Sequence, residues 1–126
     1  MNSYRDLEIY NIAYELALEI HHLSMKLPKY ELYEQGSQIR RAAQSIKDNI
    51  VEGYGRRRYK AEYIRFLIFA QSSHDETLNQ LNMINDIYYQ KNPTKEIIER
   101  YEILGRKLNK YIQYVEINWK TKHPAP

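Results

Sequence analysis

Basic side chains gather in one part of this sequence, and their most direct chemistry is the binding of phosphate groups. Residues 40–65 hold eight lysines and arginines against three acidic residues, in a chain whose formal net charge is only +3. The rest of the chain is therefore net negative, and a basic region of this kind attracts nucleic acid. A simpler interpretation, also open, is a solvated surface that keeps the protein in solution.

Tyrosines accompany these basic residues. Tyr54 and Tyr59 flank the triplet Arg56-Arg57-Arg58. Aromatic rings beside arginines can stack on unpaired bases while the guanidinium groups hold the phosphates. The sequence thus nominates ten candidate nucleic-acid-binding residues, which are Arg40, Arg41, Lys47, Tyr54, Arg56, Arg57, Arg58, Tyr59, Lys60 and Arg65.

Metal and thiol chemistry find little support in the sequence. Glu19 and His22 have the Glu-x-x-His spacing of di-metal carboxylate bundles, yet both fall on the polar face of their predicted helix. On the third predicted helix, Gln71 stands where a carboxylate would have to accompany His74. The chain has no cysteine, which excludes disulfides and thiol catalysis. We therefore expect no metal and no cofactor.

Catalytic motifs are also incomplete. His74-Asp75-Glu76 could position a base, but neighbouring residues point in different directions on a helix, and no nucleophile motif accompanies them. We expect His74 to be solvated. Gly53-x-Gly55 lacks the ending of a phosphate-binding loop and predicts a helix stop with Gly53 as its left-handed cap. The arginines beyond it are expected to form a mobile cationic corner. No catalytic residue is predicted, which favours a protein that is not an enzyme.

The elements that position these residues are helices. Apolar residues recur at helical spacing and predict helices at about 5–26, 37–53, 59–91 and 93–119, the first capped near Ser3 and the last by Asn92 and Pro93. The short connections predict an all-α, antiparallel, up-down-up-down four-helix bundle. A length of 126 residues suits a single domain, and the tail 120–126 is expected to be frayed.

Small residues mark the predicted contact between the second and third helices. Close helix packing requires small side chains on both partners, and these are Ala42, Ala43 and Ser45 on one helix and Ala70, Ser72 and Ser73 on the other. Two tyrosines at core spacing, Tyr63 and Tyr101, are expected to fill the bundle with their hydroxyls at the rim.

The first and fourth predicted helices carry more apolar residues than one buried face uses. Tyr10, Tyr14 and Leu18 form a second stripe on the first helix. A helix inside a monomeric bundle needs a single stripe, so the excess predicts a homo-oligomer. Tyrosines also tolerate half-exposed positions, which leaves a monomer open as the alternative.

The central run from Gln38 to Gly53, QIRRAAQSIKDNIVEG, resembles the signature of the 23S rRNA-intervening-sequence protein family. Leu27-Pro28 precedes the run, Arg56 follows it, and the similarity extends over nearly the whole chain. The resemblance implies a small bacterial four-helix bundle that assembles into a ring, commonly a pentamer, with no established enzymatic activity. More distantly, the chain is similar to the accessory protein of diversity-generating retroelements, which partners a reverse transcriptase and nucleic acid.

The cellular setting is predicted from what the sequence lacks. No apolar run approaches the roughly 20 residues that cross a membrane, and the N-terminus has no secretory pattern. We expect a cytoplasmic protein with no membrane partner. The favoured function is an oligomer that associates with nucleic acid, RNA above all. The alternative is a scaffold or accessory subunit that recruits a protein partner through the same arginines.

Overall fold

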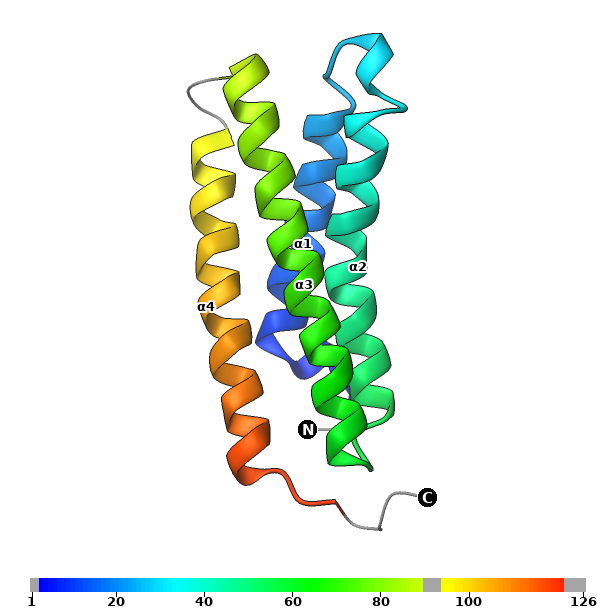
Figure 1. Cartoon of the computed structure of the whole chain (residues 1–126), viewed down its shortest axis with the longest axis vertical. Coiled ribbons are helices and arrows are strands. Elements are labelled where there is room, and N and C mark those ends of the chain that lie inside the picture. Colours follow the sequence, from blue (N-terminus) through cyan, green and yellow to red (C-terminus); the bar gives the residue numbers. More distant parts are fainter. Residues whose placement is uncertain (1–2, 90–93, 122–126) are drawn as a thin grey trace.

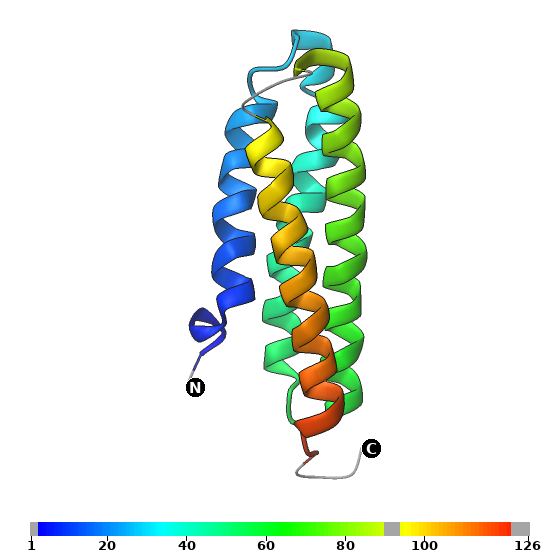
Figure 2. The same ribbon diagram turned by 90° about the vertical axis from the view of Figure 1, so that its left-hand side faces the viewer.

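The chain forms a bundle of four long helices. The computed structural model describes residues 3–89 and 94–121. Its helices are α1 (Glu8–Ser24), α2 (Gln35–Gly55), α3 (Lys60–Ile84) and α4 (Thr94–Asn118). Consecutive helices lie side by side in opposite directions (Figures 1 and 2). The predicted all-α, up-down-up-down bundle is confirmed, and the described residues contain no strand.

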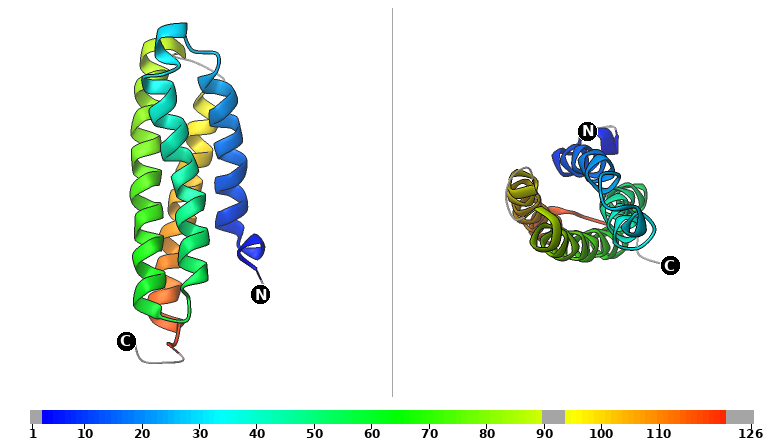
Figure 3. Two further views of the ribbon diagram at one scale, coloured as in Figure 1. Left: turned by 90° about the vertical axis from the view of Figure 1, so that its right-hand side faces the viewer. Right: turned by 90° about the horizontal axis from the view of Figure 1, so that it is seen from above.

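Each helix packs against its neighbours in chain order. Contacts join α1 to α2, α2 to α3 and α3 to α4, and a less extensive contact between α1 and α4 closes the bundle. The view from above shows this circular order (Figure 3). The buried interior is apolar and includes Leu16, Ile20, Ile46, Ile50, Leu67, Leu81, Leu104 and Leu108. Burial of these side chains supplies the main driving force for folding.

The chain enters α1 later than the sequence predicts. Ser3 and Asp6 do form a capping box, but the box caps a short 3-10 helix at Tyr4–Asp6. Leu7 then adopts an extended conformation, with φ −79° and ψ 125°, and its side chain is buried. α1 therefore begins only at Glu8.

The other helix boundaries are close to those predicted. α3 ends at Ile84 and continues as a π-helix over Asn85–Tyr89. The predicted cap at Asn92 and Pro93 lies outside the described residues. Lys120 and Thr121 are not helical, and the rest of the tail, for which fraying was predicted, also lies outside them.

Small residues bring α2 and α3 close together, as predicted. The hydroxyls of Ser45 and Ser73 are hydrogen-bonded across the contact at 2.8 Å. Gly53 continues this contact inside α2, since a Cβ there would lie 3.1 Å from the Cβ of Phe66. The interpretation of Gly53 as a helix cap is wrong, because α2 runs on to Gly55. Gly53 instead lets α3 approach.

His74 is another residue whose expected position is wrong. It is not a solvated residue, because it is only 5% exposed and lies between α3 and α4. Its Nε2 lies 2.6 Å from the carbonyl oxygen of Tyr101. The ring occupies the space beside Gly105, where a Cβ would come within 2.6 Å of it. A glycine in the middle of α4 therefore makes room for an imidazole from α3.

The two buried tyrosines fill the core as predicted, but their hydroxyls differ. The Tyr63 hydroxyl lies 2.7 Å from that of Tyr111, at the partly buried edge of the bundle. The Tyr101 hydroxyl does not reach the rim: it is buried and has no hydrogen-bond partner among the described residues. Burial raises the pKa of both phenols, so both rings stay neutral at physiological pH.

Two glycines provide a test of the α3–α4 contact. Gly105→Ala should destabilise the fold by about 1–3 kcal/mol, because the new methyl group must displace a buried, hydrogen-bonded ring. Gly55→Ala is the matched control, because a Cβ there meets nothing within 4 Å. That control should leave stability unchanged or raise it by up to about 1 kcal/mol. Urea denaturation measures both, and equal stabilities would show that His74 does not occupy this space.

Candidate nucleic-acid interface

α2 directs its basic residues toward two different neighbours. Arg40 and Lys47 lie on the side of α1: Arg40 contacts Ser24, and the Lys47 ammonium lies 6.0 Å from the ring centre of Tyr14. Arg41 lies on the side of α3, where it shares a shallow depression with Ser73. The basic residues of α2 therefore lie on two sides of this helix, although Arg40 and Arg41 border one depression in common.

Arg40 serves the fold. Its guanidinium donates to the Ser24 hydroxyl at 2.9 Å and to the carbonyl oxygen of Leu32 at 2.7 Å. These bonds join α2 to the end of α1 and to the α1–α2 connection. Lys47 is also engaged, because its ammonium lies 2.7 Å from the Asp48 carboxylate. The Arg40 guanidinium is thus hydrogen-bonded within the fold, and the Lys47 charge is partly neutralised.

Arg41 differs from its neighbour. It is exposed and lies between two shallow depressions of about 360 and 230 Å³. Ser37, Gln44 and Asp48 also line the first depression, and Gln38 and Glu76 line the second. Within residues 3–89 and 94–121, no carboxylate lies within ion-pair distance of the Arg41 guanidinium. Its charge therefore remains available to a ligand.

The arginine triplet forms the turn between α2 and α3, and its members behave differently. Arg57 stacks on the Tyr54 ring, 3.9 Å from its centre, and donates to the Tyr54 carbonyl oxygen at 2.8 Å. Arg56 forms ion pairs with Glu52 at 3.3 Å and Glu62 at 3.2 Å. Both arginines are held by their surroundings.

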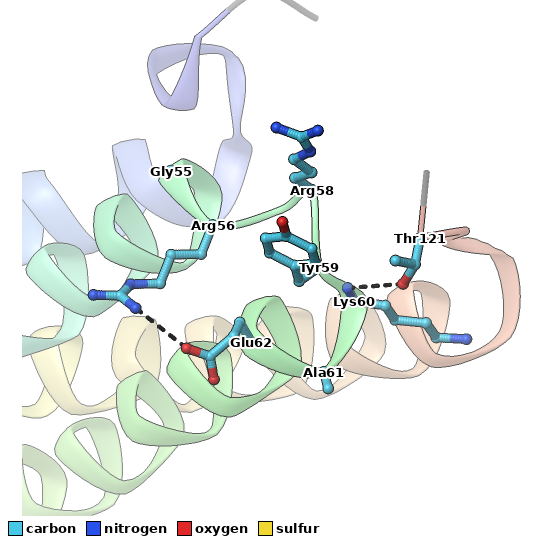
Figure 4. A pocket seen from close by; sticks show the side chains of 8 residues that line it. All are labelled: Gly55, Arg56, Arg58, Tyr59, Lys60, Ala61, Glu62 and Thr121. Atoms are coloured by element: carbon cyan, nitrogen blue, oxygen red, sulfur yellow. Dashed lines mark hydrogen bonds and ion pairs between the residues drawn. The ribbon is translucent and has the colours of Figure 1, made fainter. Parts of the chain in front are cut away.

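Arg58 is the freest member of the triplet. It is exposed, and its guanidinium lies 5.9 Å from the Tyr59 ring centre. Among the described residues, no carboxylate lies within ion-pair distance of it. Figure 4 shows its side chain pointing away from Arg56 and Glu62.

The end of α4 and the residues directly after it hold this turn in place. The Trp119 indole donates to the carbonyl oxygen of Arg57 at 2.8 Å. The backbone N–H of Lys60 donates to the Thr121 hydroxyl at 3.1 Å, and the Lys60 ammonium donates to the carbonyl oxygen of Glu116 at 2.5 Å. The arginine turn, which was expected to be a mobile corner, is therefore held by three hydrogen bonds. The sequence analysis did not predict this contact, although the single tryptophan of the chain, near its C-terminus, could have indicated it.

An aromatic cluster lies behind the turn. The Tyr63 ring contacts Tyr54, Tyr111 and Trp119 at centroid distances of 6.4, 6.1 and 5.1 Å. Tyr54 is only 5% exposed, so its ring belongs to this cluster and is not available for stacking on a base. Tyr59 is half-buried and keeps a face near solvent.

Arg65 lies further along α3 above two aromatic rings. Its guanidinium is 5.6 Å from the centre of the Phe66 ring and 5.2 Å from that of Phe69. It is exposed, with a weak pairing to Glu62 at 3.5 Å. Surface pairs of this kind contribute little, so Arg65 can contact a partner that approaches α3.

A cleft of about 630 Å³ opens beside the turn. Figure 4 shows the residues that line it: Gly55, Arg56, Arg58, Tyr59, Lys60, Ala61, Glu62 and Thr121. The cleft adjoins the first turn of α3, where the helix dipole favours negative charge. Its lining combines three cations, one carboxylate, an aromatic ring and hydroxyl groups.

Groups that could hold a metal are not found in the described part of the chain. There, no three His, Asp or Glu side chains come together as metal ligands would. Glu19, which the sequence places in a Glu-x-x-His pattern, forms an ion pair with Arg100 of α4. Nor does any described helix combine the length and apolarity needed to cross a bilayer.

These features define the class of the protein: a small antiparallel four-helix bundle with exposed arginines over α2 and the start of α3. The sequence model of the 23S rRNA-intervening sequence protein family matches residues 5–110. The chain belongs to this family. No curated protein matches the sequence. The more distant likeness to the accessory protein of diversity-generating retroelements stays a prediction.

Substitution of two adjacent arginines tests whether Arg40 stabilises the fold and Arg41 does not. Arg40→Ala should lower the free energy of unfolding by about 1–3 kcal/mol, because the Leu32 carbonyl and the Ser24 hydroxyl lose a charged donor. Arg41→Ala removes the same charge from an exposed position and should change stability by less than about 0.5 kcal/mol. Thermal and urea unfolding compare the two, and an equal loss in both variants would contradict the assignment.

Proposed function

We propose that this protein is a non-enzymatic, cytoplasmic, oligomeric RNA-binding protein of bacterial type. It contacts the phosphates of RNA through the exposed arginines of α2 and of the α2–α3 turn. The contacts are made to the backbone and carry no base specificity, as expected of guanidinium groups on an open surface.

One observation carries this proposal. Most of the basic side chains between Arg40 and Lys60 have internal partners, whereas Arg41 and Arg58 have no carboxylate partner among the described residues. Exposed cations without a carboxylate partner contribute little to the stability of the bundle, but they are well suited to neutralise phosphates and release counterions. Family membership supports the choice of RNA, because the family's name refers to an rRNA intervening sequence.

RNA binding should be sensitive to salt and should depend on these two arginines. If about four phosphates are neutralised together on a single strand, the log–log slope of affinity against salt should be roughly −3. Arg41→Ala and Arg58→Ala should each weaken binding about fivefold at 0.1 M salt and flatten the slope by about 0.7. Fluorescence anisotropy with an oligoribonucleotide, repeated over a range of salt concentrations, measures both quantities.

Arg106→Ala is the matched control for these variants. Arg106 is an exposed arginine of α4, so its loss changes net charge by the same amount on a different helix. It should leave binding nearly unchanged. Absence of salt-sensitive binding to any RNA or DNA at low ionic strength would sink the RNA proposal. The scaffold function would then take first place, with the same arginines pairing to an acidic protein partner.

Oligomerisation is the second part of the proposal. Tyr14 and Leu18 of α1 are 45% and 50% exposed, and Met25, directly after this helix, is 51% exposed. On α4, Tyr114 is 49% and Ile117 79% exposed. Apolar faces of this extent favour contacts between copies of the chain. A ring of five is the number that the family resemblance implies, and a ring would multiply weak arginine contacts along one RNA strand.

A charge on the apolar face of α1 tests this part. The wild-type protein should show a mass several times 15.3 kDa in light scattering at micromolar concentration. Leu18→Glu should lower that mass, because it buries an unpaired carboxylate in the proposed contact. Met83→Glu, at a residue 55% exposed on α3, is the control and should keep the wild-type mass. A wild-type mass near 15.3 kDa would contradict association altogether.

A further inference from the structure

The cleft beside the α2–α3 turn has the charge balance of a particular ligand. Three cations line it, Arg56, Arg58 and Lys60, against the single carboxylate of Glu62, so its lining carries a net charge of +2. Outside the lining, Glu52 pairs with Arg56 and Arg57 stacks on Tyr54, and the opposite charges of Glu52 and Arg57 leave the sum at +2. A phosphate monoester carries roughly −1.5 to −2 charges at pH 7, whereas a phosphodiester inside a strand carries one. The lining therefore matches a terminal phosphate better than an internal one.

Hydrogen-bond donors are available around the cleft. The Thr121 hydroxyl accepts the N–H of Lys60, so its own proton is free to be donated. Arg58 has no carboxylate partner within the described chain, and its five N–H groups suit phosphate oxygens. Figure 4 shows the hydroxyl end of Tyr59 turned toward Arg58. Charged donors of this kind form short, strong hydrogen bonds to phosphate.

The size and the walls of the cleft suit a nucleotide unit. Its volume of about 630 Å³ lies within the range of roughly 300–1,000 Å³ seen for small-molecule sites. Gly55 and Ala61 leave the backbone accessible, and the Tyr59 ring offers an aromatic wall for the last base. The hydrogen bonds from the Trp119 indole to Arg57 and from the Lys60 N–H to Thr121 hold the two sides of the cleft together, so the site is formed before a ligand arrives.

We infer that this cleft binds the terminal phosphate of an RNA strand, so that the protein prefers phosphorylated strand ends over hydroxyl ends. The inference rests on the RNA-binding function proposed above and gives it a substrate class. Arg41, which lies on α2 away from the cleft lining, contributes general affinity, and Arg58 contributes the preference for the end. The two arginines should therefore be separable by experiment.

The test compares otherwise identical ten-nucleotide RNAs that end in a phosphate or a hydroxyl, first at the 5′ end and then at the 3′ end. Fluorescence anisotropy should show at least about fivefold tighter binding of a phosphorylated form. Arg58→Gln should abolish this preference and retain residual RNA binding. Arg41→Gln should weaken both forms by the same factor and keep the preference. Circular dichroism and light scattering check that each variant remains folded and assembled.

Each outcome separates this inference from the proposed function. Equal affinity of wild-type protein for phosphorylated and hydroxyl ends, in both the 5′ and the 3′ pair, overturns the inference and leaves RNA binding standing. No binding to any RNA overturns both. Uridine monophosphate and inorganic phosphate serve as competitors: the strand-end inference requires the mononucleotide to compete far better. Equal competition by inorganic phosphate would show a simple anion site and overturn it.

Discussion

The close approach of α2 and α3 is the constraint on which the rest of the structure depends. Ser45 and Ser73 meet hydroxyl to hydroxyl at 2.8 Å, and Gly53 has no room for a larger side chain beneath Phe66. Because only small residues fit along this contact, the long basic side chains of α2 lie outside it. Arg40 turns toward α1, and Arg41 lies at the outer edge. The packing of two helices thus decides which cations have partners inside the fold and which remain exposed.

The arginines of the turn after α2 also differ in whether they have partners inside the fold. Arg57 lies against the Tyr54 ring, and Arg56 lies between two carboxylates. Trp119 fastens the turn to the last helix. A turn held in this way presents Arg58 in a defined position, and in the proposed binding it would lose less conformational entropy than a mobile loop. The cluster of tyrosines in this region therefore works mainly as support for the cations and less as a platform for bases.

The sequence predicts the fold well because helical periodicity and short connections leave few alternatives. The close α2–α3 contact was also predictable, since small residues recur on both helices. Side-chain partners were harder to predict. His74 looked like a surface residue because its partner is the backbone carbonyl of a distant helix, although Gly105 in the middle of α4 was a sign that something approaches there. Tyr54 looked exposed because Gly53 was interpreted as the end of α2.

Among the candidate site residues, the sequence located the basic region but could not sort its members. Arg40 and Arg41 are neighbours of identical chemistry, and only the position of α1 and of the Leu32 carbonyl separates their roles. That information is tertiary, so no local pattern contains it. Arg40 does share a side of α2 with Lys47, and this side faces α1.

The most direct test of the division between structural and available cations is an NMR titration of the arginine side chains. Each guanidinium Nε–Hε signal is assigned by substitution and followed while a short oligoribonucleotide is added to the protein. The signals of Arg41 and Arg58 should shift with a common dissociation constant, and those of Arg40 and Arg57 should stay in place. Shifts of Arg40 and Arg57 as large as those of Arg41 and Arg58, or no shift of any arginine at saturating RNA, would contradict the assignment.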